Sequence, residues 1–286
     1  LSSSSAASDV YKRQRHDHSG GKASRPIRLH ARLWTVINQG TLDLGAGAVT
    51  YTGLSNRLSG GGTINVSLGS GSATTILNGN YSNFTGTWNL GTAALAGAGK
   101  VQMNGADHSA ATIHVLENAT LYTTTGTHRA ALFLHAGNTG ESLGQLRLEG
   151  GAIWEGSMTL AGDIVGSGDG HIGANSGTGV VSGIIGESGG SRSLIKEGDG
   201  TIVLTGANTF TGLAAANDGV LLVNRPGSLA GSVSVASGAT FGGSGTVAGG
   251  IRVDAGGTLE PGYAGPVTLT VGGPLALAGT TLFRVD

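Results

Sequence analysis

The chain has 286 residues, enough for one large domain or two small ones, and its formal net charge is −1. Glycine supplies 55 residues, charged residues only 12% and apolar residues 38%; Val, Ile and Leu interleaved with glycine exclude a disordered or collagen-like chain. No apolar run approaches the roughly 18 to 20 residues of a membrane-spanning helix, and the absence of cysteine excludes disulfides, thiol nucleophiles and Cys-ligated metals.

The N-terminal segment differs in charge from the rest of the chain. Residues 1–32 hold seven basic and two acidic side chains, whereas the remaining 254 hold nine basic and fifteen acidic ones. Residues 4–14 (SSAASDVYKRQ) match the translation of a common sequencing adapter, and Leu1 is not an initiating Met. We therefore interpret residues 1–14 as a disordered artefact, and the chain as a fragment of a longer reading frame. Residues 15–32 are either more of the same or a genuine basic arm, and nucleic acid is not an expected partner.

Three glycine-led segments are expected to form the first strands: GTLDL (40–44), GTINV (62–66) and GTWNL (86–90). Each alternates apolar and polar residues, which is the pattern of a half-buried strand. Their central apolar residues, Leu42, Ile64 and Trp88, are spaced by 22 and 24 in the sequence. The segments therefore follow a loose repeat.

The middle segment, residues 107–171, has the least regular repeat. It contains five histidines: His108, His114, His128, His135 and His171. His114 and His135 are separated by about one repeat, so a metal-binding pair is a minor alternative to the favoured interpretation of exposed corner histidines. No metal or cofactor is predicted.

A ligand surface, if the chain has one, is predicted on the same middle segment. Loops project from irregular repeats, and binding groups are often found on loops that a rigid scaffold holds in place. The predicted surface includes Arg147, Trp154 and Glu155, and its expected partner is a cell-surface glycan or another polymer. The alternative is a less regular stalk without a ligand. The three tryptophans (Trp34, Trp88 and Trp154) are expected to be packing residues more than sugar platforms.

The repeat becomes regular from Ile195 onward. Five glycine-led strands are expected: GTIVL (200–204), GVLLV (219–223), GATFG (238–242), GGTLEP (256–261) and GTTLF (279–283). Their central apolar residues are spaced by 19, 20, 18 and 23: Ile202, Leu221, Phe241, Leu259 and Leu282. A second series advances by 18 and 18: Val233/Val235, Ile251/Val253 and Leu269/Val271. We expect both series to point into one core from successive turns.

These periods predict an all-β fold, a parallel β-solenoid over residues 33–286. A repeat of about 20 residues is too short for a domain and does not suit a helical repeat. Helical signals are nearly absent because the Ala-rich stretches are short and broken by glycine. About twelve turns, each of roughly 18–24 residues, are expected from this repeat. A β-sandwich is the alternative.

The segment SLIKEGDGTIVLTGANTFTG (193–212) resembles the passenger-associated transport repeat, also called the autotransporter-associated β-strand repeat, of bacterial surface proteins. The matching residues are Leu194, Lys196, Gly198, Gly200, Thr201, Ile202, Leu204, Gly206, Asn208, Thr209, Phe210 and Gly212. The repeat spans 193–223, but its second half lacks the usual Thr-x-Val turn. Residues 256–273 resemble the proline–glycine turn that often follows such a repeat, and residues 33–192 resemble the flanking β-helix only in style.

The resemblance implies a right-handed parallel β-helix that is secreted or displayed at the outer membrane of a Gram-negative-type bacterium. Its role would be that of a structural stalk and display surface, with adhesion as an accompanying role. A translocation barrel or another anchor is expected outside this fragment.

The rival class is an enzyme, a β-helical polysaccharide lyase or glycosidase. Such chemistry needs paired carboxylates or clustered Asp with Arg or Lys, and the acidic residues form no obvious cluster at the spacing of one turn. The motif GDGHIG (168–173) and two G-x-S-x-G matches (140–144 and 186–190) are expected by chance in a glycine-rich chain. No catalytic residue is therefore predicted.

Overall fold

The computed structural model describes residues 35–45, 49–68, 74–91, 99–105, 108–117, 119–136, 142–162, 168–263, 265 and 267–283. All of them belong to one compact unit, Leu33–Asp286. The interpretations of residues 1–14 and 15–32, and of Trp34, fall outside the described residues. In the described part, the one helical element is a 3-10 turn, η1 (Thr52–Leu54). No helix found there is long and apolar enough to cross a membrane.

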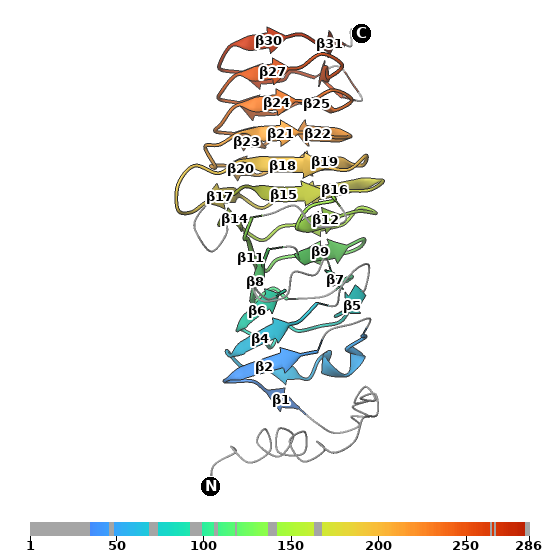
Figure 1. Cartoon of the computed structure of the whole chain (residues 1–286), viewed down its shortest axis with the longest axis vertical. Helices are drawn as coiled ribbons and strands as arrows, with labels where there is room; N and C mark the ends of the chain where they lie inside the picture. Colours follow the sequence, from blue (N-terminus) through green and yellow to red (C-terminus); the bar gives the residue numbers. More distant parts are fainter. Residues whose placement is uncertain are drawn as a thin grey trace, which may run out of the picture. The chain divides into compact units, whose positions relative to one another are not determined.

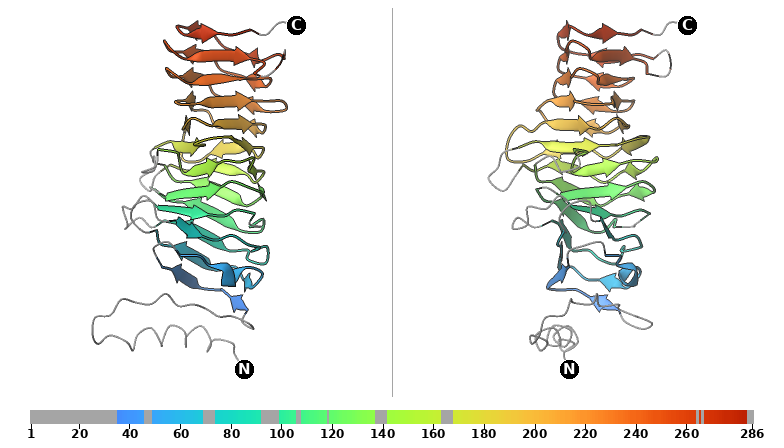
Figure 2. Two further views of the ribbon diagram at one scale, coloured as in Figure 1. Left: turned by 90° about the vertical axis from the view of Figure 1, so that its right-hand side faces the viewer. Right: turned by 45° about the vertical axis from the view of Figure 1, so that its right-hand side comes forward.

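The described strands pair only in parallel, and they stack one above another along the unit (Figures 1 and 2). The longest sheet has ten strands: β5 (Thr74–Ile76), β7 (Gly99–Gln102), β9 (Ala119–Thr123), β12 (Leu146–Leu148), β15 (Gly170–Gly173), β18 (Leu194–Glu197), β21 (Ala214–Ala216), β24 (Val233–Val235), β27 (Ile251–Val253) and β30 (Leu275–Leu277). This ten-stranded sheet runs through most of the stack.

The other sheets form the remaining faces. The eight-stranded sheet comprises β10 (Thr127–His128), β13 (Ile153–Trp154), β16 (Thr178–Val181), β19 (Thr201–Leu204), β22 (Val220–Val223), β25 (Thr240–Gly243), β28 (Thr258–Pro261) and β31 (Thr280–Thr281). The seven-stranded sheet comprises β2 (Thr41–Leu44), β4 (Thr63–Val66), β6 (Thr87–Leu90), β8 (Thr112–Val115), β11 (Ala131–Leu134), β14 (Met158–Leu160) and β17 (Ile185–Glu187). A four-stranded sheet comprises β20 (Ala207–Asn208), β23 (Ser228–Leu229), β26 (Thr246–Val247) and β29 (Thr270–Val271), and a two-stranded sheet comprises β1 (Val36–Ile37) and β3 (Leu58–Ser59).

The chain visits one strand of each face in every regular turn. It passes, for example, from β18 through β19 and β20 to β21, which lies beside β18. This is the predicted parallel β-solenoid, and all-parallel pairing excludes the β-sandwich alternative, whose sheets are antiparallel.

The structure has about ten turns rather than the expected twelve, as the ten-stranded sheet shows. The difference comes from the length of the middle turns. The register partners Leu121 and Leu146 are spaced by 25 in the sequence, and Leu146 and Ile172 are spaced by 26. These turns are longer than those of the regular repeat, so fewer turns fit into the same chain length.

Inward-facing residues of successive turns build one continuous apolar core. Ile202, Leu221, Phe241 and Leu259 are register partners in the eight-stranded sheet, and all are buried, as predicted. The looser N-terminal series is confirmed as well, because its three central residues are register partners in the seven-stranded sheet: Leu42, Ile64 and Trp88.

Two predictions at the C-terminal end were wrong. Leu282 is 47% exposed, because the residue opposite Leu259 is Thr281 and the ladder is therefore shifted by one position. Leu269 and Val271 do not extend the Val233/Ile251 series. Val271 belongs to β29 of the four-stranded sheet, and that series continues instead at Leu275 and Leu277.

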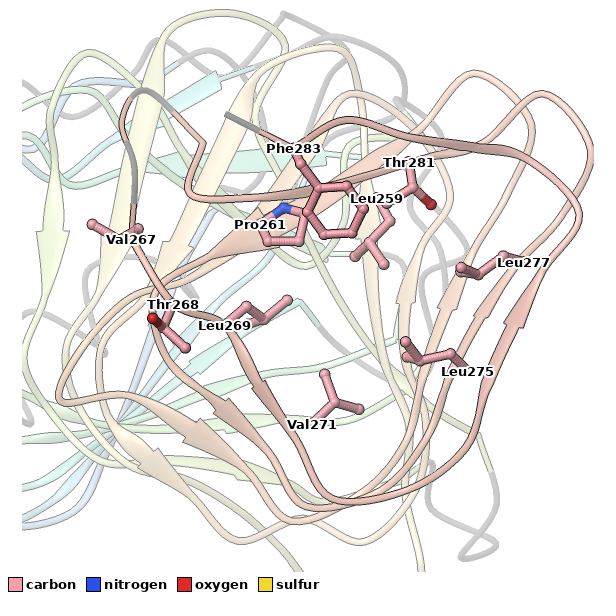
Figure 3. Close-up of a pocket in the computed structure, with 10 residues that line it drawn as sticks. All are labelled: Leu259, Pro261, Val267, Thr268, Leu269, Val271, Leu275, Leu277, Thr281 and Phe283. Atoms are coloured by element: carbon pink, nitrogen blue, oxygen red, sulfur yellow. The ribbon is translucent and has the colours of Figure 1, made fainter. Parts of the chain in front are cut away.

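The last described turn leaves its apolar residues uncovered. Leu275 and Leu277 continue the buried ladder of the ten-stranded sheet, yet they are 51% and 46% exposed. Together with neighbouring side chains they line an apolar pocket at this end (Figure 3): Leu259, Pro261, Val267, Thr268, Leu269, Val271, Thr281 and Phe283. The pocket therefore exposes the apolar core at the last described turn.

Buried polar side chains fix the corners of the turn that contains residues 193–212. Lys196 is fully buried, and its Nζ donates to the carbonyls of Gly198, of Gly200 at 2.5 Å and of Asp218 at 2.8 Å. Asn208 accepts a hydrogen bond from the backbone N–H of Ile185 in the turn before and donates to a carbonyl of the turn after. These contacts satisfy backbone groups that the corners leave without a strand partner.

Candidate interaction surface

The three residues of the predicted ligand surface do not form one surface. Arg147 lies on β12 of the ten-stranded sheet, whereas Glu155 follows β13 of the eight-stranded sheet. Trp154 is only 1% exposed and stacks on the ring of His128, with centroids 5.4 Å apart. Trp154 is therefore a core residue, because alternation along β13 turns it inward. Its burial, like that of Trp88, agrees with the packing role expected for the tryptophans.

Arg147 lies in a compact polar cluster with Tyr122 and Glu149, which we call the Arg147 cluster. Tyr122 on β9 is the register partner of Arg147, and the guanidinium carbon lies 4.5 Å from the centre of its ring. Arg147 Nε donates to Glu149 Oε1 at 2.7 Å, and Tyr122 donates to Glu149 Oε2 at 3.4 Å. The side chains of this ion pair are only 12% and 10% exposed.

The Arg147 cluster is attached to the backbone of the next turn. Glu149 Oε1 also accepts the backbone N–H of Asn175 at 2.7 Å. A cation held over an aromatic ring and anchored by a carboxylate is a rigid group, with little side-chain entropy left to lose.

A second polar pair, joined by a hydrogen bond, lies further along the same sheet. His171 Nδ1 on β15 is 3.2 Å from Glu197 Oε1 on β18. The GDGHIG motif that contains His171 forms the corner and strand β15 of one turn, and Asp169 accepts the backbone N–H of Ser193. The motif is therefore part of the solenoid framework.

The prediction of exposed corner histidines was wrong. None of the five histidines is exposed, and His108 and His128 are each only 3% exposed. Aromatic rings cover several of them. His108 stacks on Tyr81 at 4.7 Å, and His114 stacks on Phe133 at 4.6 Å. The register that aligns inward residues also aligns aromatic rings of successive turns. The rings of His108 and His114 therefore pack against them by stacking.

His114 and His135 face each other on the seven-stranded sheet. Nδ1 of His114 and Nε2 of His135 are 2.7 Å apart and share a hydrogen bond. Burial lowers the pKa of both rings, and the neighbouring imidazole contributes to the lower pKa of His114. Burial also lowers the pKa of His128. Because ordinary histidine titrates near pH 6.5, these three side chains are neutral at pH 7.

A polar ladder leads along the outer face of the seven-stranded sheet to His114. Asp43, Asn65, Asn89 and His114 are successive register partners. Asn65 Nδ2 donates to Asp43 Oδ1 at 2.8 Å, and Asn89 Nδ2 donates to Asn65 Oδ1 at 2.9 Å. Sequence reasoning missed this ladder. Its signal in the sequence is a triplet that recurs in four successive strands of this sheet: Thr, an apolar residue, and then Asp, Asn or His.

Comparison with known proteins gives one local similarity. Over 77 residues, 27% of the chain, the sequence is 36% identical to part of a protein described as "Adhesin BmaC autotransporter" from Brucella suis biovar 1 (strain 1330). The matched part is 2% of that protein, so the chain spans a very small share of this relative. No protein-family profile and no solved structure matches the chain. The parallel β-solenoid and this similarity fit an autotransporter passenger.

Proposed function

We propose that the chain is part of a surface-displayed passenger of the autotransporter type, and that its β-helix serves as a stalk and display surface. The observation that carries this proposal is the continuous stack of parallel strands, in which one sheet extends from β5 to β30. In such a stack each turn contacts only its neighbours, so that length and stability grow with the number of turns. The local similarity to an autotransporter adhesin supports the same conclusion.

The contacts of the acidic side chains favour a structural role over the lyase or glycosidase alternative. Glycoside hydrolysis needs two carboxylates that face a substrate. Glu149 instead binds Arg147 and a backbone N–H of the next turn. Glu187 likewise accepts a hydrogen bond from the backbone N–H of Arg192 at 2.7 Å. Both carboxylates hold the framework together.

Adhesion is the second part of the proposal. The Arg147 cluster presents the ring of Tyr122 and the guanidinium of Arg147 on the outer face of the ten-stranded sheet, and the buried Glu149 holds Arg147 in place. Such a group suits a cell-surface glycan or another polar polymer. Loops at the corners of the middle turns would add further contacts.

Surface display is tested in a Gram-negative host that expresses the complete reading frame. An antibody against residues 33–286 should label intact cells. Labelling that appears only after cell lysis would contradict surface display.

Adhesion is tested with the purified chain on a glycan array. The double variant Tyr122→Ala/Arg147→Ala should lose binding, whereas Arg252→Ala should retain it. Arg252 lies on the same sheet outside the middle segment and pairs with Asp254 at the surface. Equal binding by the parent and the double variant would contradict the assignment of the site, and turnover of a polysaccharide by the parent would favour the enzyme alternative.

A further inference from the structure

The pair formed by His114 and His135 has a geometry that packing alone does not require. His114 projects from the outer face of β8, and His135 directly follows β11 in the next turn. The register partner of His114 is Phe133, so His135 reaches back over two positions to place its Nε2 2.7 Å from His114 Nδ1. Two ring nitrogens thus point at one another across adjacent turns.

Neighbouring groups hold both rings in place. The ring of Phe133 lies 4.6 Å from that of His114 at an angle of 9°. The carbonyl of Gly162 accepts a hydrogen bond from the ring of His135. Backbone carbonyls commonly orient histidines in metal sites through such a contact. Little side-chain freedom remains for a bound ion to remove.

We propose that His114 and His135 form a two-histidine chelate for a divalent transition-metal ion. Imidazole suits Cu²⁺, Ni²⁺ and Zn²⁺. With metal–nitrogen distances of about 2.0–2.1 Å and a tetrahedral angle, the two nitrogens need to be about 3.3 Å apart. Small side-chain rotations achieve this separation. The proton of the shared hydrogen bond moves to the outward nitrogen of its ring, and the two facing lone pairs then bind the ion.

The other coordination positions would belong to water. Within the described ranges, no group of three or more His, Cys, Asp or Glu side chains is placed to hold a metal ion. The carboxylate of Glu117, in the turn after β8, acts electrostatically on His135 and adds negative potential that attracts a cation. The bound ion would therefore keep open positions, which a ligand from another molecule can occupy.

The direct test is Cu²⁺ binding to the chain of residues 1–286, followed by electron paramagnetic resonance. The histidines at 16, 18 and 30 are changed to Ala in every sample so that they do not compete. We expect one Cu²⁺ ion per chain, nitrogen couplings from two imidazoles, and a rise in melting temperature on binding. By the usual order of stability, Cu²⁺ should bind more tightly than Ni²⁺ or Zn²⁺.

Variants separate this site from adventitious binding. His114→Ala and His135→Ala should each weaken Cu²⁺ binding roughly tenfold or more and remove one nitrogen coupling. His171→Ala, which changes a histidine on another sheet, should bind as the parent does. His135→Gln, which retains an N–H donor for Gly162, replaces His135→Ala if that variant fails to fold. Unchanged binding in the His114 and His135 variants, or loss of binding only in the His171 variant, would overturn the proposal.

Discussion

Lys196 shows how one residue explains the spacing of the motif around it. Its ammonium group lies inside the solenoid and binds three carbonyls, two of which belong to Gly198 and Gly200 of the same Lys-x-Gly-x-Gly run. The third carbonyl, that of Asp218, belongs to the next turn. The lysine therefore joins two successive corners, which accounts for glycine and lysine at this spacing.

Replacement of Lys196 by Met is expected to destabilise the protein by about 2–4 kcal/mol, because it leaves buried carbonyls without donors. Urea unfolding at neutral pH measures the change. Arg252→Met is the control, since Arg252 is a surface residue in an exposed ion pair, and its replacement should change stability by less than about 1 kcal/mol. Equal effects of the two changes would contradict the role assigned to Lys196.

The buried histidines predict a loss of stability in acid. Burial lowers the pKa of His128, so the unfolded chain binds a proton below about pH 6.5 whereas the folded protein binds it only at a lower pH. Stability from this group is present above pH 6.5 and is lost as the pH falls, by up to about 2 kcal/mol at pH 5.

The variant His128→Gln tests this dependence. Urea unfolding at pH 7.5 and at pH 5 should show a smaller acid-induced loss in the variant than in the parent. The same loss in both proteins would show that His128 does not contribute.

At the scale of strands, burial follows register. Leu221 and Leu282 were expected in one ladder, but Leu221 is fully buried and Leu282 is 47% exposed. Leu221→Asp should cost several kcal/mol, because it places an unpaired charge in the core. Leu282→Asp should have little effect. Thermal unfolding of both variants measures the difference, and a tolerated Leu221→Asp would contradict the described core.

The regular third of the chain was predictable because its turns have nearly equal length. Nearly constant spacings align Ile202, Leu221, Phe241 and Leu259 without insertions. The prediction failed at Leu282, where a longer turn follows Pro261. Alternation of apolar and polar residues looks the same in either register, so a shift of one position is invisible in the sequence.

The candidate site was less predictable for the same reason. Sequence reasoning placed polar groups on the middle segment, and Arg147 does lie in an outward-facing cluster. The burial of His128 against Trp154 depends on which rings meet between the longer turns of this segment. That alignment depends on corner lengths, which the sequence pattern does not define.

For the whole molecule, the solenoid should be stable without residues 1–14. The match of residues 4–14 to an adapter motivates this prediction. Deletion of residues 1–14 should leave the melting temperature of the protein unchanged. A loss of several degrees would show that the segment contributes to the fold.

Parallel stacking in the assigned register defines the β-helix, and the cysteine-free sequence permits a direct test of this register by disulfide formation. Ser234 on β24 is the register partner of Arg252 on β27, whose next partner is Ala276 on β30. Register partners in adjacent strands lie about 4.8 Å apart, which is close enough for a disulfide. Residues two strands apart are too far from one another to form one. Ser234→Cys/Arg252→Cys should therefore form an intramolecular disulfide under mild oxidation, and Ser234→Cys/Ala276→Cys should not. A disulfide in the second variant and none in the first would contradict the β-helix described here.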